Sequence, residues 1–267
     1  MKTLKALVTP CPNDTFSLLP WAFGNVKTPI SLSLEFSDIE SINKLSLQNT
    51  EYDLIKCSYS QYNRMNDMYN ILPAGSAFTT TIGPLIICRE EHIKKTPKQL
   101  RIGIPGENTT AYLLLNHYLD PFKEIIVLPY EQMLTSCENG DIDCALIIHE
   151  LQFMAYKYGF KQYANLFDHW YTSNKLPLPL GGFFLRKETF NTDTINHIIH
   201  QSISYSYQHY NNSINRSIPY ATVSESKEVI ENHIKTYVTD RKSFSSDEIN
   251  AIKILSHMQK QSNQQHV

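Results

Sequence analysis

The stretch Ala145-Leu146-Ile147-Ile148-His149-Glu150 decides how this sequence folds, because it is an apolar run of strand type that ends in a histidine. Apolar residues without polar alternation are typical of a strand that is covered on both faces in the centre of a sheet. In open α/β proteins the carboxyl ends of such strands face the ligand crevice. His149 is therefore a candidate general base; the alternative is a histidine that ends the strand and binds a backbone carbonyl.

Other apolar runs surround this stretch and alternate with segments of helical pattern. This alternation predicts an α/β fold with much parallel sheet. The expected strands span residues 4–9, 30–36, 53–57, 84–88, 101–104, 125–128, 144–148 and 182–185. The expected helices span residues 15–23, 39–48, 59–68, 110–119, 131–138, 151–158, 194–210, 227–237 and 247–259. The last three helices follow one another without a strand, which predicts a helical C-terminal layer.

Two segments have the composition of joints between lobes. Residues 90–99 are charged and contain a proline, and residues 175–182 are rich in proline and glycine. Two joints predict a discontinuous domain, in which residues 1–90 and 182–267 build a larger α/β lobe and residues 91–181 a smaller inserted one. The chain would then cross a hinge twice beneath a central cleft.

Composition excludes several classes of protein. The chain has 24 Lys+Arg against 26 Asp+Glu and no basic run, so nucleic acid is not an expected partner. No export signal or apolar run of the roughly 18 residues that span a bilayer is visible, which predicts a cytoplasmic protein without a membrane partner. The five cysteines form no C-x-x-C pair and are expected to be reduced thiols: Cys11, Cys57, Cys88, Cys137 and Cys144.

Two further junctions between a strand and a helix carry polar side chains. After the first expected strand, two prolines fix the turn and place Asn13 or Asp14 where it can cap the next helix or contact a ligand. After the third, Lys56, Cys57 and Ser58 follow one another, and alternation along an extended chain puts Lys56 and Ser58 on one face. A surface salt bridge is the alternative explanation for Lys56.

The junction that contains Asn108, Thr109 and Thr110 is a strand, a glycine turn and a helix start. Free backbone N–H groups at a helix N-terminus, with two hydroxyls beside them, predict a seat for a carboxylate or phosphate. The sequence lacks the G-K-[ST] ending of a nucleotide-binding loop, so a single small anion is favoured over a triphosphate. Simple capping by Asn108 or Thr109 is the alternative.

All four junctions fall at the carboxyl ends of expected strands, so a closed cleft would gather them around one ligand. Glu150 is not expected to orient the His149 ring, because successive strand residues point to opposite faces. His197 and His200 lie three residues apart on an expected helix without a third ligand at metalloenzyme spacing, so no metal site is predicted.

Five segments of this sequence together resemble the 1,4-dihydroxy-6-naphthoate synthase family of the futalosine route to menaquinone. They are Thr9-Pro10-Cys11-Pro12-Asn13-Asp14-Thr15-Phe16, Lys56-Cys57-Ser58-Tyr59, Asn108-Thr109-Thr110-Ala111-Tyr112, Leu146-Ile147-Ile148-His149-Glu150 and Leu176-Pro177-Leu178-Pro179-Leu180-Gly181. The resemblance implies the two-lobed fold of type II periplasmic solute-binding proteins. It also implies a carbon-carbon lyase that uses no cofactor and cleaves cyclic dehypoxanthinyl futalosine to 1,4-dihydroxy-6-naphthoate and dihydroxyacetone.

The same resemblance assigns roles to residues. His149 would be the proton acceptor, and Lys56, Cys57, Ser58, Thr109 and Thr110 would contact a small carboxylate substrate. Cys57 departs from the family pattern, in which an apolar residue such as leucine is expected, so no role of its side chain is carried over. Two alternatives stay open: a sister enzyme of the chorismate dehydratase type, and a non-catalytic protein that binds a small acid. The sequence does not determine the oligomeric state.

Overall fold

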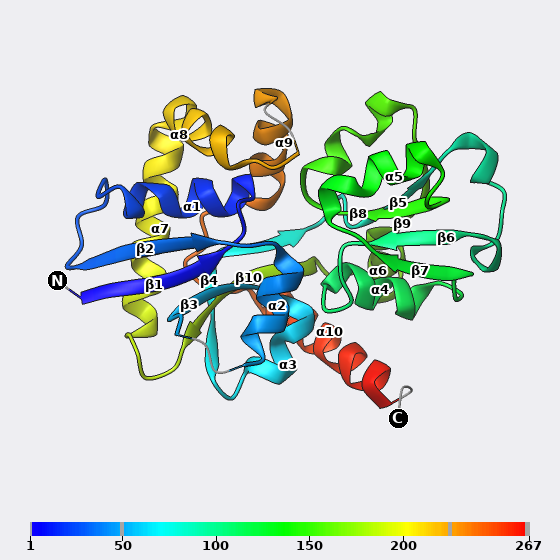
Figure 1. The fold of residues 1–267 in the computed structure, drawn as a ribbon. Coiled ribbons are helices and arrows are strands. Elements are labelled where there is room, and N and C mark those ends of the chain that lie inside the picture. The colour runs from blue at the N-terminus through cyan, green and yellow to red at the C-terminus, as the bar shows by residue number, and fades with distance from the viewer. Residues whose placement is uncertain (1, 49–50, 224–225, 265–267) are drawn as a thin grey trace.

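The computed structural model describes residues 2–48, 51–223 and 226–264, and this part of the chain forms two five-stranded sheets (Figure 1). The first sheet has the strand order β2 (Ile30–Phe36), β1 (Lys2–Val8), β3 (Leu54–Ser58), β10 (Leu178–Arg186) and β4 (Tyr69–Thr79). The second has the order β7 (Glu124–Val127), β6 (Arg101–Ile104), β8 (Cys144–Ile147), β5 (Leu85–Cys88) and β9 (Lys161–Asn165).

The chain passes between the sheets after β4 and again before β10. We call residues 2–79 and 178–264 the first lobe and residues 85–174 the second lobe. The sequence placed the first passage near residue 90, but β5 pairs with β8 and β9, so residues 85–88 belong to the second sheet. The charged segment 90–99 connects two strands of that sheet, whereas the first passage is the short segment 80–84, which includes Gly83 packed against Phe167.

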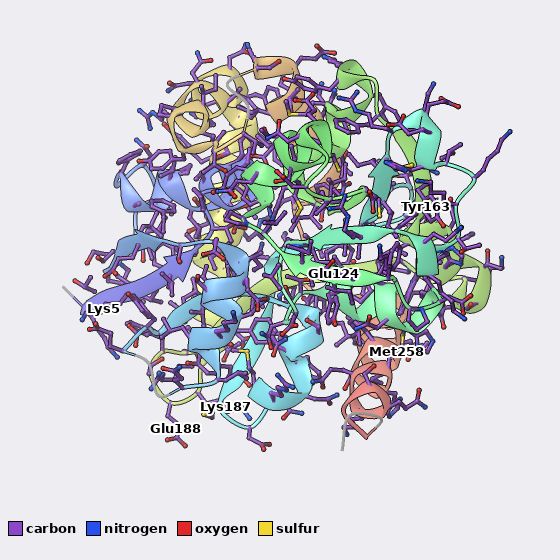
Figure 2. The ribbon with its side chains drawn as sticks, turned by 45° about the vertical axis from the view of Figure 1, so that its right-hand side comes forward. Lys5, Glu124, Tyr163, Lys187, Glu188 and Met258 are labelled. Carbon is purple, nitrogen blue, oxygen red and sulfur yellow. The ribbon has the colours of Figure 1, made fainter. Side chains whose placement is uncertain are left out.

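The strands that carry the four junctions run parallel in pairs. β1 pairs in parallel with β3, and β6 pairs in parallel with β8. Their carboxyl ends therefore meet at one edge of each sheet, and Figure 1 shows these edges facing the junction between the lobes. Figure 2 shows the same ribbon with its side chains and labels Lys5 on β1, and Glu124 and Tyr163 on the edge strands β7 and β9.

Helices cover both faces of each sheet. On one face of the first sheet, α1 (Pro12–Ala22), α7 (Thr192–Gln208), α8 (Tyr210–Ser217) and α9 (Lys227–Tyr237) pack over an apolar cluster that includes Leu4, Phe183 and Ile199. A second cluster runs under both sheets and joins α2 (Ile39–Ser46), α3 (Tyr62–Met65), α4 (Thr110–Tyr118), α6 (Leu166–Asn174) and α10 (Ser246–Gln264). The third lies between the second sheet and α5 (Met133–Asn139). The C-terminal helices follow one another without a strand, as predicted, but they do not form one layer, because α10 packs on the other face of the first sheet from α7, α8 and α9.

Two observations concern the cysteines and the lengths of the helices. All five cysteines are buried and free, which agrees with the prediction of reduced thiols. Within residues 2–48, 51–223 and 226–264, no helix combines the length and the apolar character that crossing a membrane requires.

Gly75 in β4 is a position where the structure leaves no room for a side chain. Its φ is +77°, and a Cβ built there would lie 2.1 Å from Cε2 of Phe183. We expect Gly75→Ala to lower the free energy of unfolding by about 2–5 kcal/mol, the sum of overpacking and left-handed strain. Urea denaturation measures this loss.

The matched control is Gly24→Ala. Gly24 has a similar φ of +71°, but no atom lies within 4 Å of a Cβ added there. This variant retains only the backbone strain, about 1–2 kcal/mol. Equal losses in the two variants would contradict the packing argument.

Candidate active site

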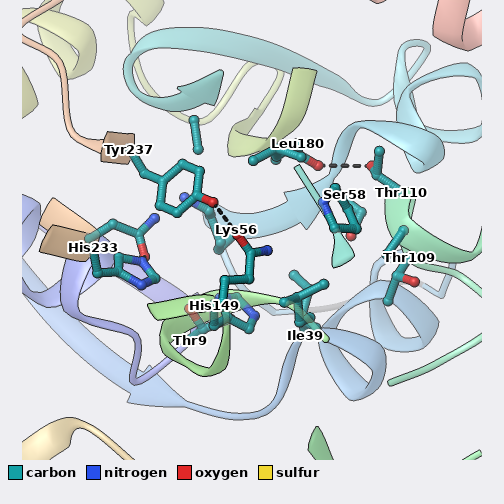
Figure 3. A pocket seen from close by; sticks show the side chains of 17 residues that line it. Thr9, Ile39, Lys56, Ser58, Thr109, Thr110, His149, Leu180, His233 and Tyr237 are labelled. Atoms are coloured by element: carbon teal, nitrogen blue, oxygen red, sulfur yellow. Dashed lines mark hydrogen bonds between the residues drawn. The ribbon is translucent and has the colours of Figure 1, made fainter. Parts of the chain in front are cut away.

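A cavity lies between the two lobes, at the place where the four junctions meet (Figure 3). The first lobe contributes Thr9 directly after β1 and residues from α1, α2, β3, β4, β10 and α9, and the second lobe contributes the segments after β6 and β8. The lining residues are Thr9, Asn13, Ile39, Lys56, Ser58, Ala77, Pro84, Thr109, Thr110, Ala111, Ile148, His149, Gln152, Leu180, Gly181, His233 and Tyr237. The structure thus brings His149 together with groups that follow residues 56 and 108.

His149 begins a 3₁₀ segment, His149–Phe153, one residue after the end of β8, and it is a half-buried residue at the cavity. Its φ is +52°, a left-handed conformation that is uncommon for residues other than glycine. Such backbone strain persists only where the surrounding structure enforces it, and it concentrates at functional sites. The sequence predicted a helix over 151–158, but this region is two short 3₁₀ segments.

A thiol from the other lobe contacts the His149 ring. Sγ of Cys11 lies 3.2 Å from Nδ1 of His149, so this ring nitrogen faces a thiol and not the backbone carbonyl that the alternative interpretation expected. Nε2 is then the ring nitrogen that is left for a ligand. Burial lowers the pKa of His149 to about 4, and the positive charge of Lys56 adds to this shift. The imidazole is therefore neutral at pH 7.

Lys56 forms a buried ion pair at the floor of the cavity. Its Nζ lies 2.5 Å from Oδ1 of Asp14, and the two side chains are 6% and 1% exposed. Asp14 also accepts a hydrogen bond from Oγ1 of Thr9 at 2.5 Å and one from Nδ2 of Asn13 at 3.1 Å. Lys56 further donates to the carbonyl of Gly75 at 3.3 Å. The lysine is thus a buried structural cation and not part of a surface salt bridge.

Hydroxyl groups form the opposite wall. Thr109 caps α4 by accepting from the Tyr112 N–H, and Oγ1 of Thr110 donates to the carbonyl of Leu180 in the other lobe at 2.8 Å. Ser58 accepts from Nδ2 of Asn43 at 2.9 Å. Lys56 and Ser58 both line the cavity, as strand alternation predicted.

Three predicted ligand contacts do not line the cavity. Cys57 points to the other face of β3, where it packs in the apolar cluster under the sheets. Asp14 lies beneath Lys56 and is fully buried. It is also not an N-cap, because α1 already begins at Pro12 with Cys11 as its N-cap.

Asn108 is the third of these residues, and it binds a carboxylate of the protein itself. Its backbone N–H and its Nδ2 donate to the two carboxylate oxygens of Glu40 on α2, at 3.0 and 2.8 Å. The carbonyl of Asn108 accepts hydrogen bonds from Asn43, Ser60 and Gln61. The carboxylate of Glu40 therefore occupies the Asn108 part of the predicted anion site and connects the two lobes. Thr109 and Thr110 still line the cavity.

Sequence reasoning missed the contribution of α9. His233 and Tyr237 line the cavity from this helix, and Oη of Tyr237 donates to Oε1 of Gln152 in the second lobe at 2.7 Å (Figure 3). A signal was available. His233 lies on the buried face of α9 with apolar residues such as Ile230 and Ile234, at helical spacing. A histidine among apolar residues on the buried face of a helix must find a polar partner, and that partner can come from a distant part of the sequence.

Among the described residues, one group has the side-chain types and the spacing of a metal site: Cys11, His149 and Glu150. One ligand-type atom of each lies within 4.8 Å of the others. Burial raises the pKa of the Cys11 thiol well above its usual value, so the thiol keeps its proton in the metal-free protein. A metal that bound here would have to displace this proton, and we assign none of the three residues as a metal ligand.

Comparison with known proteins places the chain in a family. A family model described as menaquinone biosynthesis matches residues 8–261. A 1,4-dihydroxy-6-naphthoate synthase of Thermus thermophilus is 32% identical over 240 residues, which cover 89% of this chain and 86% of that relative. A protein of the same name from Streptomyces coelicolor is 32% identical over 190 residues, or 69% of this chain and 66% of the relative.

Solved structures show the fold. A crystal structure of a protein from Archaeoglobus fulgidus superimposes with a TM-score of 0.88 at 26% identity and covers 98% of both chains. The ligand-binding component of an ABC-type import system from Staphylococcus aureus gives a TM-score of 0.71 at 13% identity and covers 98% of this chain and 92% of that one. The periplasmic aliphatic sulphonate binding protein of Escherichia coli gives 0.68 at 11% identity, over 98% and 88% of the chains. The chain therefore has the predicted fold of the periplasmic binding proteins, and it belongs to the menaquinone-biosynthesis family, which includes its 1,4-dihydroxy-6-naphthoate synthase relatives.

Proposed function

We propose that this chain is a carbon-carbon lyase that cleaves cyclic dehypoxanthinyl futalosine to 1,4-dihydroxy-6-naphthoate and dihydroxyacetone, with His149 as the general base. Membership of the menaquinone-biosynthesis family and 32% identity to two proteins named for this product support the reaction. The observation that carries the role of His149 is its place: a neutral imidazole at the cavity between two lobes, with Nδ1 against Cys11.

The residues of the cavity suit this chemistry. A cleavage that forms an aromatic ring system needs removal of a proton from carbon or hydroxyl and stabilisation of an oxyanion, but no redox cofactor or metal. For Nε2 of His149 to accept that proton, Nδ1 must carry the hydrogen of the neutral ring and direct it at Sγ of Cys11. The N-terminus of α4 at Thr110 then offers backbone N–H groups to the carboxylate of the substrate.

The pKa of His149 decides when the base is available. A ring with a pKa of about 4 is almost entirely neutral at pH 7, so it can accept a proton but holds it weakly. An anionic substrate beside the ring favours the imidazolium and opposes the effect of Lys56. We therefore expect substrate binding to raise the pKa of His149 toward the working pH.

Incubation of the purified chain with cyclic dehypoxanthinyl futalosine tests the proposal. Naphthoate absorbance should appear together with equimolar dihydroxyacetone. Chorismate in a parallel incubation tests the sister dehydratase, and its consumption in place of the futalosine derivative would overturn the assignment.

A non-catalytic binding protein is the second candidate, because the chain shares its fold with the ligand-binding component of an import system and with a periplasmic sulphonate binding protein. Calorimetry with the cyclic futalosine derivative distinguishes the two functions. Tight binding from which the unchanged compound is recovered would favour the binding protein, and recovery of naphthoate and dihydroxyacetone would favour the lyase.

A further inference from the structure

Two titratable side chains face each other across the cleft without a hydrogen bond between them. Glu150 follows His149 in the second lobe, and His233 lies on α9 of the first lobe. The side chains are 0% and 2% exposed, and Oε2 of Glu150 lies 3.9 Å from Nδ1 of His233. Among the described residues, no side chain forms a hydrogen bond with either carboxylate oxygen of Glu150 or with Nδ1 of His233. Buried polar atoms of this kind are rare and require an explanation.

The neighbouring amide fixes the tautomer of His233. Nδ2 of Asn13 donates to Oδ1 of Asp14 at 3.1 Å, which turns Oδ1 of Asn13 toward His233. That oxygen lies 3.2 Å from Nε2 of His233, so Nε2 carries the hydrogen of the neutral ring and donates it. Nδ1 is then a hydrogen-bond acceptor. It faces a carboxyl group, which can satisfy it only if that group carries a proton.

The distance between Glu150 and His233 also favours a direct hydrogen bond over a bridging water. A bridging water with two hydrogen bonds of about 2.8 Å would hold its partners roughly 4.5 Å apart. The 3.9 Å between Oε2 of Glu150 and Nδ1 of His233 is too short for such a water. A side-chain movement of about 1 Å would bring these two atoms to hydrogen-bond distance. The His233 ring is also nearly parallel to the His149 ring, with centroids 6.2 Å apart. The Glu150–His233 pair therefore lies directly beside His149.

The charges around the pair favour its neutral form. The one ammonium in the group, Lys56, is committed to Asp14. Burial raises the pKa of Glu150 to about 7, and the negative charge of Asp14 adds to the shift. Burial lowers the pKa of His233 well below its usual value, with further contributions from His149 and Lys56. The titratable groups that surround the pair, from every element packed against it, are Cys11, Asp14, Lys56, Tyr130, His149 and Tyr237.

We propose that Glu150 is a neutral carboxylic acid that donates its proton to Nδ1 of His233, and that this bond across the cleft positions His149. Glu150 and His233 are positioning residues, and this inference rests on the proposed role of His149 as the base. When Glu150 loses its proton, a buried carboxylate without a cation faces two neutral imidazoles, and the contact between the lobes is destabilised. Turnover therefore decreases as pH rises through the ionisation of Glu150.

The variant Glu150→Gln tests this pH dependence. Its amide still donates to Nδ1 of His233 but cannot ionise. We expect kcat/KM of the wild type to fall tenfold per pH unit on the alkaline side of an apparent pKa near 7, and kcat/KM of E150Q to stay level from pH 7 to 9. An alkaline decrease in E150Q with the midpoint of the wild type would overturn the proposal.

Glu228→Gln is the matched control. Glu228 lies on the same helix as His233 and pairs across the lobes with Lys157 at 3.3 Å, but both side chains are more than half exposed. An exposed pair contributes little, so E228Q should keep the midpoint and slope of the wild type. A flattened profile in E228Q would show that any loss of charge between the lobes has this effect, and would overturn the specific role of Glu150.

Infrared spectroscopy on the full chain locates the proton independently of turnover. The wild type minus E150Q difference spectrum should contain the carbonyl stretch of a protonated carboxylic acid at pH 6 and lose it at pH 9. Nitrogen NMR should show the Nε2–H tautomer of His233 at pH 6. A carboxylate signal at pH 6 would overturn the proposal. If the wild type bound the cyclic futalosine derivative without cleaving it, the proposed function would fail, but the infrared and NMR results would still decide where the proton lies.

Discussion

Exchanging His149 for asparagine is expected to lower the turnover of cyclic dehypoxanthinyl futalosine by roughly 10³-fold, within the range that a general base contributes. Asparagine is the informative replacement because it accepts the left-handed backbone at this position, where φ is +52°. His149→Ala should abolish turnover as well, although it adds backbone strain. Ligand binding should remain measurable in both variants, since other groups of both lobes still line the cavity.

Steady-state kinetics and calorimetry with the naphthoate product separate these effects. A base acts in the transition state, so kcat should fall while the dissociation constant of the product changes little. His117→Ala is the control, because this exposed histidine lies on α4 of the same lobe and outside the cavity. Near-normal turnover in H149N would remove His149 from the mechanism.

The sequence predicted most of the strands because their apolar runs are local signals. It missed β4 and β9. The stretch Tyr69–Thr79 of β4 contains Pro73, Gly75 and several small residues, and its pairing with β10 is irregular, so no period of two is visible. The stretch Lys161–Asn165 of β9 is polar because it forms an exposed edge of the second sheet. Both strands depend on tertiary pairing more than on their own composition.

The boundary of the first lobe was misplaced for a related reason. Residues 90–99 have the charged composition of a linker between lobes, but a surface connection within one lobe has the same composition. The true passage at 80–84 is short and largely packed against the protein, with Gly83 beside Phe167. Only the pairing of β5 with β8 reveals it.

The candidate site was predictable where a local rule applied. The carboxyl ends of parallel strands pointed to His149, Lys56 and Thr110, and all three line one cavity. The partners of these residues were not predictable, because they lie far away in sequence: Cys11 is 138 residues from His149. The prediction for Glu150 assumed that strand alternation continues past β8. The chain leaves the strand at Ile147, and a carboxylate oxygen of Glu150 lies within 4.8 Å of ligand-type atoms of both Cys11 and His149.

Exchanging Lys56 for methionine is expected to destabilise the fold by about 3–5 kcal/mol, because Asp14 then keeps a buried negative charge without a cation. For a chain of this size the loss corresponds to a decrease of roughly 6–20 °C in Tm. Calorimetry measures it. The same change removes one of the two causes that lower the pKa of His149, so the pKa of the ring should rise in K56M.

The double variant Lys56→Met/Asp14→Asn separates the charge from the packing. The amide oxygen introduced by the second substitution still accepts from Thr9, and no charge remains buried, so most of the stability lost in K56M should return. Turnover gives the second comparison. If Lys56 only neutralises Asp14, the double variant should regain activity along with stability, whereas a stable but inactive double variant would show that the ammonium acts on the substrate or on His149 directly. A K56M protein as stable as the wild type would contradict the buried ion pair itself, since a solvated aspartate needs no partner.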